Sequence, residues 1–275
     1  MPELPELEVV RDVLQRRVAG ATIENVQVLP PGGAIVVRDL TQTGFAQTLT
    51  GATITSITRR GKFLVFAFES PVFLVINPKL TGRLQLAAPT EKRLAKTHVI
   101  FSLSTGKELR YVDQKRMGQL YLTRELALVP GFAGLGPEPF DISLDEFRER
   151  LRPFRGEIKG VLTRGECVAG IGNAYADEIL WNAQLHPYRK RTQLTPEEIE
   201  RLYRAMQATL RDATEHVRAE LGESIHREPR DFLAVHLKTG APCPRCGTPI
   251  SLVGANQRIT NFCRTCQPGG LIKGM

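Results

Sequence analysis

The chain has 275 residues, too many for one small domain and enough for two or three hydrophobic cores. Hydrophobic residues make up 42% and charged residues 24%, which is ordinary for a globular protein. The 37 Lys and Arg outnumber the 29 Asp and Glu, and the resulting charge of +8 makes a polyanion a plausible partner. No stretch of about 18 apolar residues occurs, so we expect no membrane span. The acidic, proline-rich start is unlike a secretory signal.

The N-terminal part of the chain predicts one helix followed by strands. Residues 5–19 repeat apolar positions at helical spacing, Pro5 suits a first helical position, and Gly20 ends the helix. From Thr22 to about Leu122 the pattern changes to short β-type runs bounded by Gly and Pro. Several such strands predict a sandwich or a barrel. The clearest runs are 54–57, 63–68, 72–76 and 98–103.

Helices dominate the second half of the chain. Residues 130–141 contain three Pro and three Gly, so we place the main domain boundary there. A capping box opens a helix at Ser143, and a second box opens a long amphipathic helix at Thr195. Between them, a glycine-rich turn enters a further helix at 174–181. The expected fold is α+β and multidomain, with a first domain over 1–130, a linker over 131–141, a helical domain over 142–236 and a tail unit over 237–275.

Four cysteines in the tail predict a metal site. Two Cys-x-x-Cys pairs are separated by 16 residues. Zinc prefers four soft ligands in a tetrahedron, and each pair places two thiolates on one tight knuckle. Two unrelated pairs or a redox motif are the alternatives. The pattern fits a reducing cytosol better than a disulfide framework, and we expect the fifth cysteine, Cys167, to be a small buried apolar residue. The predicted ligands of one structural Zn²⁺ are Cys243, Cys246, Cys263 and Cys266.

Two further stretches are candidate anion-binding elements. A zinc ribbon would carry Arg258 near its hairpin tip, where this side chain could contact a groove or a phosphate or remain a solvated surface charge. Gly170-Ile-Gly-Asn173 precedes a predicted helix, and glycines there let backbone N–H groups approach a phosphate. A plain turn with Asn173 as the N-cap explains that stretch equally well.

The N-terminus offers a candidate nucleophile. If Met1 is removed, the chain begins with a proline amine beside Glu3 and Glu6. A chain-terminal amine has a pKa of about 8, so more of it is neutral and nucleophilic at pH 7 than of a lysine. It can condense with an aldehyde carbon to give an iminium, with Glu3 as the proton donor or acceptor. The same residues also form a good helix start, so this motif alone does not establish catalysis.

In this order, the motifs resemble those of the formamidopyrimidine-DNA glycosylase and endonuclease VIII family of bacterial base-excision repair enzymes. The likeness is closer to the formamidopyrimidine type and covers nearly the whole chain. It implies a catalytic N-terminal helix and β-sandwich, a helical domain with a helix–two-turns–helix element, and a C-terminal zinc ribbon. The matching segments are Pro2-Glu3-Leu-Pro-Glu6-x-Glu8, Arg59-Arg-Gly-Lys62, Leu74 through Gly82, Glu157 through Glu178, and Gln257-Arg258-x-Thr260 with the final Cys-x-x-Cys-Gln267.

The resemblance implies glycosylase and AP lyase chemistry on an extruded nucleotide. Pro2 would attack the sugar C1′ and form a Schiff base, and Glu3 would be the general acid that helps to open the deoxyribose. Extruding the base costs a few kcal/mol, and side chains inserted into the gap would offset part of this cost. After the base departs, β,δ-elimination would cleave the strand.

The resemblance also implies which residues hold the DNA. Lys62 joins the catalytic set as a phosphate ligand, and Glu6 and Glu178 would support the site of the damaged base. The residues implied to bind phosphates or to fill the gap left by the base are Leu80, Lys115, Arg116, Met117, Asn173 and Arg258.

Two departures from the family pattern bear on the substrate. Lys115 stands where formamidopyrimidine-type members usually carry Arg, and it lacks the planar fork that reads an orphaned cytosine, although Arg116 could substitute. A loop that follows the long helix helps to cover 8-oxoguanine in the family, and here the corresponding loop over 222–236 is altered and the stretch to the first zinc cysteine is short. Ring-opened purines, hydantoins and oxidised pyrimidines are therefore open alternatives to 8-oxoguanine opposite cytosine.

Three classes of protein remain at this point. The expected one is a bifunctional, cytoplasmic DNA glycosylase and lyase that acts as a monomer on damaged double-stranded DNA and has no membrane partner. The second is a non-catalytic damaged-DNA-binding protein on the same scaffold, and the third is an unrelated zinc-ribbon protein that binds RNA or protein. Retention of Pro2, Glu3 and Lys62 favours the first, because binding alone needs no nucleophile at position 2.

Overall fold

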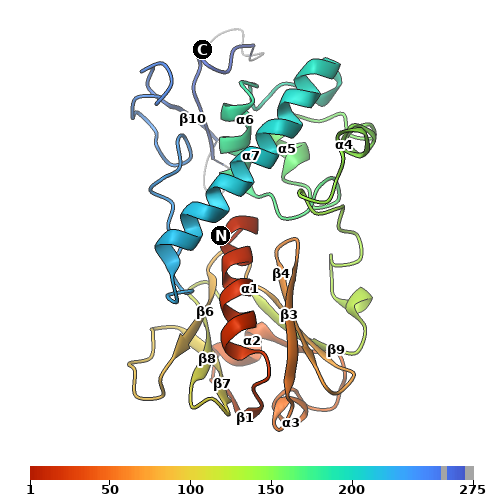
Figure 1. Ribbon diagram of the computed structural model, residues 1–275, viewed down its shortest axis with the longest axis vertical. Coiled ribbons are helices and arrows are strands. Elements are labelled where there is room, and N and C mark those ends of the chain that lie inside the picture. Colours follow the sequence, from red (N-terminus) through yellow and green to blue (C-terminus); the bar gives the residue numbers. More distant parts are fainter. Residues whose placement is uncertain (255–258, 270–275) are drawn as a thin grey trace. The chain divides into compact units, whose positions relative to one another are not determined.

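The computed structural model describes residues 1–254 and 259–269 and divides the chain into two compact units (Figure 1). Arg258, predicted to lie near the hairpin tip, falls outside the described residues. No helix in the described ranges is long and apolar enough to cross a membrane. Unit 1 comprises Met1–Gly134 and Thr214–Pro229, and unit 2 comprises Leu135–Ala213 and Arg230–Met275.

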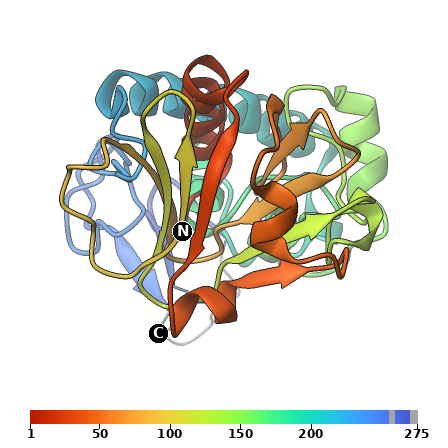
Figure 2. The ribbon, with the colours of Figure 1, turned by 90° about the horizontal axis from the view of Figure 1, so that it is seen from below.

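Unit 1 is a sandwich of two β-sheets, seen in Figure 2 as two layers of strands. The first sheet has the strand order β1-β7-β8-β6 and is antiparallel throughout. The second has the order β2-β9-β5-β4-β3, in which only the β2–β9 pair is parallel. The prediction of strands over this region and of a sandwich is confirmed. The strands are Ile23–Val28 (β1), Val37–Asp39 (β2), Ile54–Arg60 (β3), Phe63–Phe68 (β4), Phe73–Asn77 (β5), Gly82–Ala87 (β6), Thr97–Leu103 (β7), Glu108–Asp113 (β8) and Gln119–Thr123 (β9).

The core of unit 1 lies between the two sheets and under helix α1. Phe66 and Leu74 come from the second sheet, Phe101 and Tyr111 from the first, and all four are buried in one hydrophobic cluster. Strand β4 is buried on both faces, which explains its almost continuous apolar sequence. Helix α1, Leu4–Val18, packs on β3 and β4 through its apolar face, as its spacing predicted. The remaining short helices of the unit are Gly32–Val36 (α2), Phe45–Leu49 (α3) and Leu126–Leu128 (η1).

Unit 2 is helical and ends in a small hairpin. The predicted capping box at Thr195 is present, and at Ser143 the structure shows the N-cap half of the predicted box. The Ser143 hydroxyl accepts the Glu146 N–H at 3.2 Å, and Thr195 and Glu198 bond reciprocally at 3.3 and 2.9 Å. The elements are Leu144–Leu151 (α4), Ile158–Leu162 (α5), Asn173–Asn182 (α6), Arg191–Gln193 (η2), Pro196–Leu221 (α7), Ser251–Val253 (β10) and Thr260–Phe262 (β11).

The division into units cuts helix α7. Residues 214–229, which the sequence places with the helical domain, cluster with unit 1, because Ile225 enters the core of the sandwich and Arg218 pairs with Asp12 of α1 at 2.8 Å. The other end of unit 1, at Gly134, falls inside the predicted linker 131–141. The finger clusters with the helices in unit 2, so its separate boundary at 237 stays a prediction.

Candidate active site and DNA-binding elements

The N-terminal carboxylates are buried in the cap of α1. Glu3 is the N-cap residue and forms a capping box with Glu6, whose Oε2 accepts the Glu3 N–H at 2.8 Å. Glu3 and Glu6 are only 1% and 2% exposed, so both carboxylates are held beside Pro2 with little freedom. The same residues therefore start α1 and hold the candidate catalytic group. The interpretation as a helix start and the interpretation as a catalytic N-terminus are compatible.

A narrow hollow in unit 1 opens at Pro2. Its lining includes Glu6 of α1, Arg83 of β6 and Glu228 of the segment after α7. Glu228 faces two cations, since its Oε1 lies 3.0 Å from the Met1 ammonium and its Oε2 contacts the guanidinium of Arg83. Sequence analysis missed Arg83 and Glu228. The two residues are 145 positions apart, so no spacing signal connects them.

Lys62 occupies the turn between β3 and β4. The neighbouring Gly61 has φ +56°, a left-handed conformation that glycine adopts without strain. The turn is tied to α1, because Arg59 pairs with Glu8 and also donates to the Gly61 carbonyl at 3.1 Å. Burial raises the pKa of Glu8, but the charge and hydrogen bonds of Arg59 outweigh it and hold this pKa below its usual value. These contacts hold the turn that carries the half-buried Lys62.

The predicted gap-filling residues lie on two loops that share one anchor. Asp113 is fully buried and accepts the backbone N–H of Lys115 at 3.1 Å and of Gly118 at 2.8 Å. The same carboxylate accepts the hydroxyl of Thr81, in the turn that carries Leu80. A Cβ on Gly118 would collide with the hydroxyl of Tyr111, so only glycine lets this loop close. Lys115, Arg116 and Met117 stay exposed, as side chains that enter DNA must be.

Asn173 lies at the first position of α6, on an open groove of unit 2. Gly172 is the N-cap residue, so the alternative of Asn173 as an N-cap is wrong. Its side chain instead donates to the Ile259 carbonyl at 2.9 Å, next to β11. The groove is also lined by two exposed arginines, Arg155 and Arg164. Asn173 therefore joins a basic groove to the base of the zinc hairpin.

A buried charge network holds the hairpin to α5 and α6. The Lys159 ammonium lies 2.6 Å from Asp177 and donates to the Ile259 carbonyl and the Thr260 hydroxyl, each at 2.9 Å. Asp177, fully buried, also contacts His236 Nδ1 at 2.8 Å. Buried charges persist only when they are paired, so each member depends on the others. Lys159 and Asp177 lie in the segment 157–178 that matches the family pattern, but the sequence predicted no role for them or for His236.

Asp177→Asn should destabilise unit 2 by about 3 kcal/mol or more, because it leaves the ammonium of Lys159 buried beside a neutral amide. Trp181 is the only tryptophan of the chain and lies in α6, so its fluorescence during urea unfolding measures this change. Adding Lys159→Met should restore part of the loss. Asp145→Asn, which removes an exposed pair with Arg148, is the control and should cost less than about 1 kcal/mol. Equal losses in both single variants would contradict the network.

Glu178, predicted to support the site of the damaged base, holds the chain segment 234–236. Its carboxylate accepts the backbone N–H groups of Ala234, Val235 and His236 at 2.8 to 2.9 Å. Burial raises its pKa, although these three donors oppose the shift. The carboxylate is thus occupied by the chain segment that leads into the finger. A role at the damaged base stays a prediction, and the contacts favour a positioning role.

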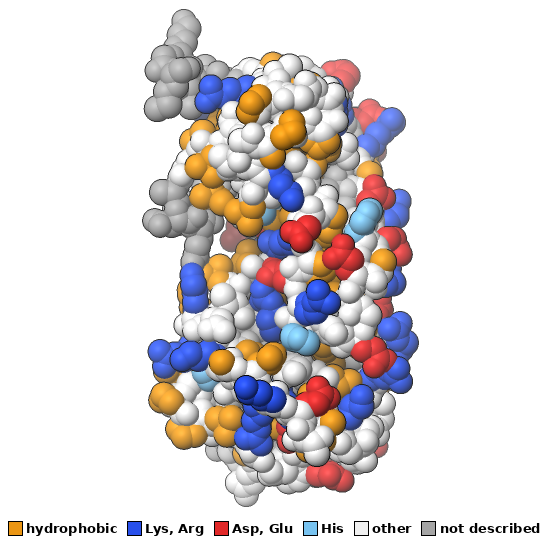
Figure 3. Space-filling model, turned by 90° about the vertical axis from the view of Figure 1, so that its left-hand side faces the viewer, with side chains coloured by type: hydrophobic (Ala, Val, Ile, Leu, Met, Phe, Trp, Pro, Cys, Tyr) orange, Lys and Arg blue, Asp and Glu red, His pale blue; other side chains and the backbone are white. Residues whose placement is uncertain are grey.

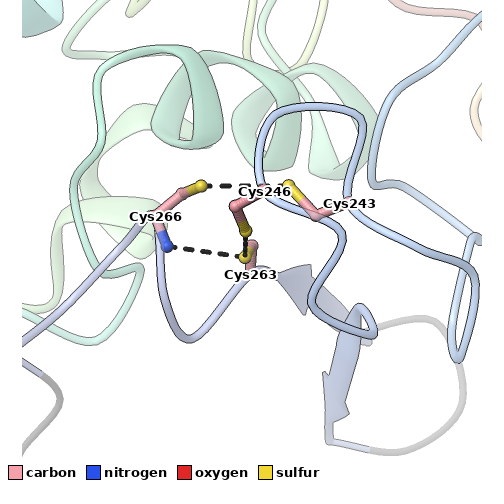
Figure 4. A group of neighbouring side chains, drawn as sticks. All are labelled: Cys243, Cys246, Cys263 and Cys266. Carbon is pink, nitrogen blue, oxygen red and sulfur yellow. Dashed lines mark hydrogen bonds between the residues drawn. The ribbon is translucent and has the colours of Figure 1, made fainter.

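The four predicted zinc ligands converge (Figure 4). Their sulfur atoms lie within 4.8 Å of one another, with Cys246 and Cys263 3.4 Å apart and Cys243 and Cys266 3.9 Å apart. A tetrahedron with Zn–S bonds of about 2.3 Å has sulfurs roughly 3.8 Å apart, so the cage fits this ion. Cys167 is buried elsewhere, and burial raises the pKa of its thiol to about 11, as expected of an inert residue.

Without a bound cation, the thiols of the cage differ in pKa. Hydrogen bonds from Thr248 lower the pKa of Cys246 to about 6, whereas burial and the neighbouring sulfurs raise the pKa of Cys266 to about 12. Four thiolates so close together need a dication to be ionised at once. The cage is fixed to α6, since Trp181 donates to Cys243 Sγ at 3.4 Å and Gln267 bonds both Cys263 and the Leu185 carbonyl.

One face of the molecule shows no single basic patch. On the face drawn in Figure 3, Lys and Arg side chains are spread among hydrophobic and acidic ones. The candidate contacts with DNA are therefore assigned to individual elements. The candidates are the 61–62 turn, the 78–82 turn and the 114–118 loop of unit 1, and the Asn173 groove of unit 2.

The two units and the cysteine cage define a zinc-finger enzyme with an N-terminal β-sandwich. Three family models match it in order: Formamidopyrimidine-DNA glycosylase N-terminal domain over residues 1–120, Formamidopyrimidine-DNA glycosylase H2TH domain over residues 135–223, and Zinc finger found in FPG and IleRS over residues 240–269. The chain is 40% identical to a Symbiobacterium thermophilum formamidopyrimidine-DNA glycosylase, over 98% of this chain and 90% of that protein.

Solved structures agree with these matches. A complex between Lactococcus lactis Fpg and DNA containing Fapy-dG has a TM-score of 0.85 and 33% identity, covering 97% of this chain and 100% of that one. The Fpg protein from Thermus thermophilus has a TM-score of 0.84 and 34% identity, with 98% and 100% coverage. The chain belongs to the formamidopyrimidine-DNA glycosylase family. The predicted fold, the enzyme class of bifunctional DNA glycosylase and AP lyase, and the structural zinc site are confirmed.

Proposed function

We propose that this protein removes oxidised or ring-opened purines from double-stranded DNA and cleaves the strand at the resulting abasic site. The single observation that carries the proposal is the N-terminus. Pro2, which becomes the terminal amine when Met1 is lost, lines a hollow together with the buried Glu6 and is followed by the buried Glu3, in a chain that matches Fpg proteins over nearly its whole length. Complexes of the Lactococcus lactis protein with DNA containing Fapy-dG support this substrate class. We also propose that the protein works as a monomer in the bacterial cytoplasm.

The Pro2 amine, exposed by loss of Met1, attacks C1′ of the extruded nucleotide and displaces the damaged base. Glu3 lies next to the nucleophile in sequence and is held by the helix cap. It protonates the ring oxygen as the deoxyribose opens, which leaves an iminium between Pro2 and C1′. The iminium makes the neighbouring sugar protons acidic, so the 3′ and then the 5′ phosphate are eliminated. The zinc ion holds the finger and takes no part in these steps.

The DNA is held by side chains from both units. Lys62, Asn173 and Arg258 bind phosphates that flank the extruded nucleotide. Leu80 and Met117 enter the vacated space as apolar wedges, supported by the shared anchor at Asp113. The exposure of Met117, 48%, is high for a methionine and is consistent with this task.

The base opposite the damaged one is recognised less strictly than in relatives that carry Arg at the position of Lys115. An ammonium is a point donor and cannot make two parallel hydrogen bonds to cytosine. The exposed Arg116 has φ +53°, a conformation uncommon outside glycine, and this places a second cation on the same loop. We therefore propose that ring-opened purines are preferred and that 8-oxoguanine opposite cytosine is a weaker substrate.

Borohydride trapping of the processed protein on a panel of duplexes tests the proposal. The duplexes carry Fapy-dG, 8-oxoguanine, an oxidised pyrimidine or an abasic site. We expect an adduct mapped to Pro2 on the first and last of these, with Fapy-dG ahead of 8-oxoguanine. An adduct on the abasic duplex alone would contradict the base preference. No adduct on any duplex, with duplex binding intact, would favour a non-catalytic damaged-DNA-binding protein.

A further inference from the structure

We propose that Glu228 is the proton acceptor of the N-terminal amine. The inference rests on the proposed function, because it concerns the step in which that amine bonds to C1′. The amine cannot form an iminium without losing its N–H proton, and a nearby base must take this proton. Within the N-terminal motif, Glu3 is already assigned as the acid that opens the sugar, and one carboxylate oxygen of Glu6 accepts the Glu3 N–H.

Distances place Glu228 at the amine. In the unprocessed chain, Glu228 Oε1 lies 3.0 Å from the Met1 nitrogen. The Glu228 side chain is 16% exposed, so water screens this contact only partly. Loss of Met1 moves the terminal charge to the Pro2 nitrogen, one residue along the chain. Pro2 and Glu228 line the same hollow, so the carboxylate remains the acidic partner of the new terminus.

The segment that carries Glu228 is fastened to the rest of unit 1 by residues that precede Glu228 and by Glu228 itself. Ile225 is 2% exposed and belongs to the core cluster of the sandwich. Glu223 pairs with Arg17 at the end of α1, and Arg83 of β6 contacts Glu228 itself. The carboxylate is therefore positioned by packing and ion pairs rather than by the Met1 contact alone.

The other ionisable groups on the described lining of the hollow are poorer acceptors. Arg83 and Arg227 are cations with no acceptor atom. Tyr111 is buried, and burial together with the charge of Asp113 raises its pKa above the ordinary value, so it stays protonated. Glu6 has one carboxylate oxygen committed to the Glu3 N–H. Glu228 is the remaining carboxylate on this lining, and its Oε1 faces the terminal amine while its Oε2 contacts the guanidinium of Arg83.

Atoms and charge balance when Glu228 takes the proton. The lone pair of the neutral Pro2 nitrogen forms a bond to C1′, and the base departs with the electron pair of the glycosidic bond. The nitrogen is now a cation with one N–H, and this proton passes to Oε1 of Glu228. The restored lone pair then expels the ring oxygen, which takes a proton from Glu3. On an abasic site the same N–H proton is lost on the way from carbinolamine to iminium.

Glu228→Ala in the processed protein tests this role. On an abasic duplex we expect the rate of borohydride trapping to fall by about 10²-fold or more, with duplex affinity within about threefold of the parent. Sodium formate, a small carboxylate that fits the space left by the side chain, should restore part of the rate. Glu223→Ala, which breaks the Arg17 pair on the same segment, is the matched control and should trap within about threefold of the parent.

Arg83→Met distinguishes two roles of Glu228, namely proton transfer from the amine and attachment of its segment to β6. It removes the same ion pair but leaves the carboxylate, so it should lose much less trapping rate than Glu228→Ala. Equal losses in these two variants, or a Glu228→Ala loss that formate does not relieve, would overturn the proposal while leaving the Pro2 mechanism intact. Failure of the parent protein to trap on any duplex would instead overturn the proposed function.

Discussion

Acetylation of the Pro2 amine is expected to abolish both adduct formation and strand cleavage. An amide nitrogen has no available lone pair, so neither attack on C1′ nor iminium formation can occur. The loss should exceed about 10³-fold, since without the covalent intermediate both activities disappear together. Duplex affinity should change by less than about threefold, because acetylation leaves the proposed phosphate ligands Lys62 and Asn173 chemically unchanged.

The companion variant is Pro2→Gly, which replaces a secondary amine by a primary one. We expect duplex binding to persist and the rate of trapping to fall, because glycine also frees the backbone in front of the α1 cap. Pro5→Ala removes a proline from the same turn without touching the amine and is the matched control. Intact mass must first show that Met1 is absent, since a retained Met1 caps Pro2 with an amide. Parent-like cleavage by the acetylated protein would eliminate Pro2 as the nucleophile.

Much of the fold could be predicted because its signals are local. Strand β4 is buried on both faces and reads as an unbroken apolar run, and the helix starts at Ser143 and Thr195 follow from residues three positions apart. The zinc cage was predicted from spacing, because each knuckle is built from two cysteines three positions apart. In all these cases the physical interaction and the sequence pattern span the same few residues.

The rest of the site could not be predicted from the sequence because its contacts are long-range. Arg83 and Glu228, or Lys159 and Thr260, pair across more than a hundred residues, and a single charged residue carries no mark of its distant partner. Glu178 shows a second limit. Its position in the motif was evident, but three backbone N–H groups that approach it from 234–236 could not be predicted from that motif. The end of α7 and the segment after it were assigned to the helical domain for the same reason, since their partners Asp12 and Arg17 lie at the other end of the chain.

Cys263→Ser is expected to release the zinc ion and to weaken duplex binding by at least about tenfold. A structural zinc site contributes about 10 kcal/mol or more to the folding of an isolated finger, and few apolar side chains are present to replace it. Zinc content, measured by mass spectrometry of the metal, should fall from one ion per chain to nearly none. Cys167→Ser makes the same chemical change at a buried cysteine outside the cage, and it should retain the zinc.

The loss of structure caused by Cys263→Ser should stay within the finger, because residues of α5 and α6 hold the hairpin independently of the cysteines. Lys159 and Asn173 bond the Ile259 carbonyl without help from the metal, so β11 keeps part of its attachment. The indole of Trp181 donates to Cys243, so its fluorescence should change when zinc leaves. Unit 1, which shares no ligand with the cage, should unfold at the same denaturant concentration as in the parent. Loss of duplex affinity with an unaltered unit 1 would show that the finger serves DNA binding, whereas unchanged zinc content would refute the four-cysteine site.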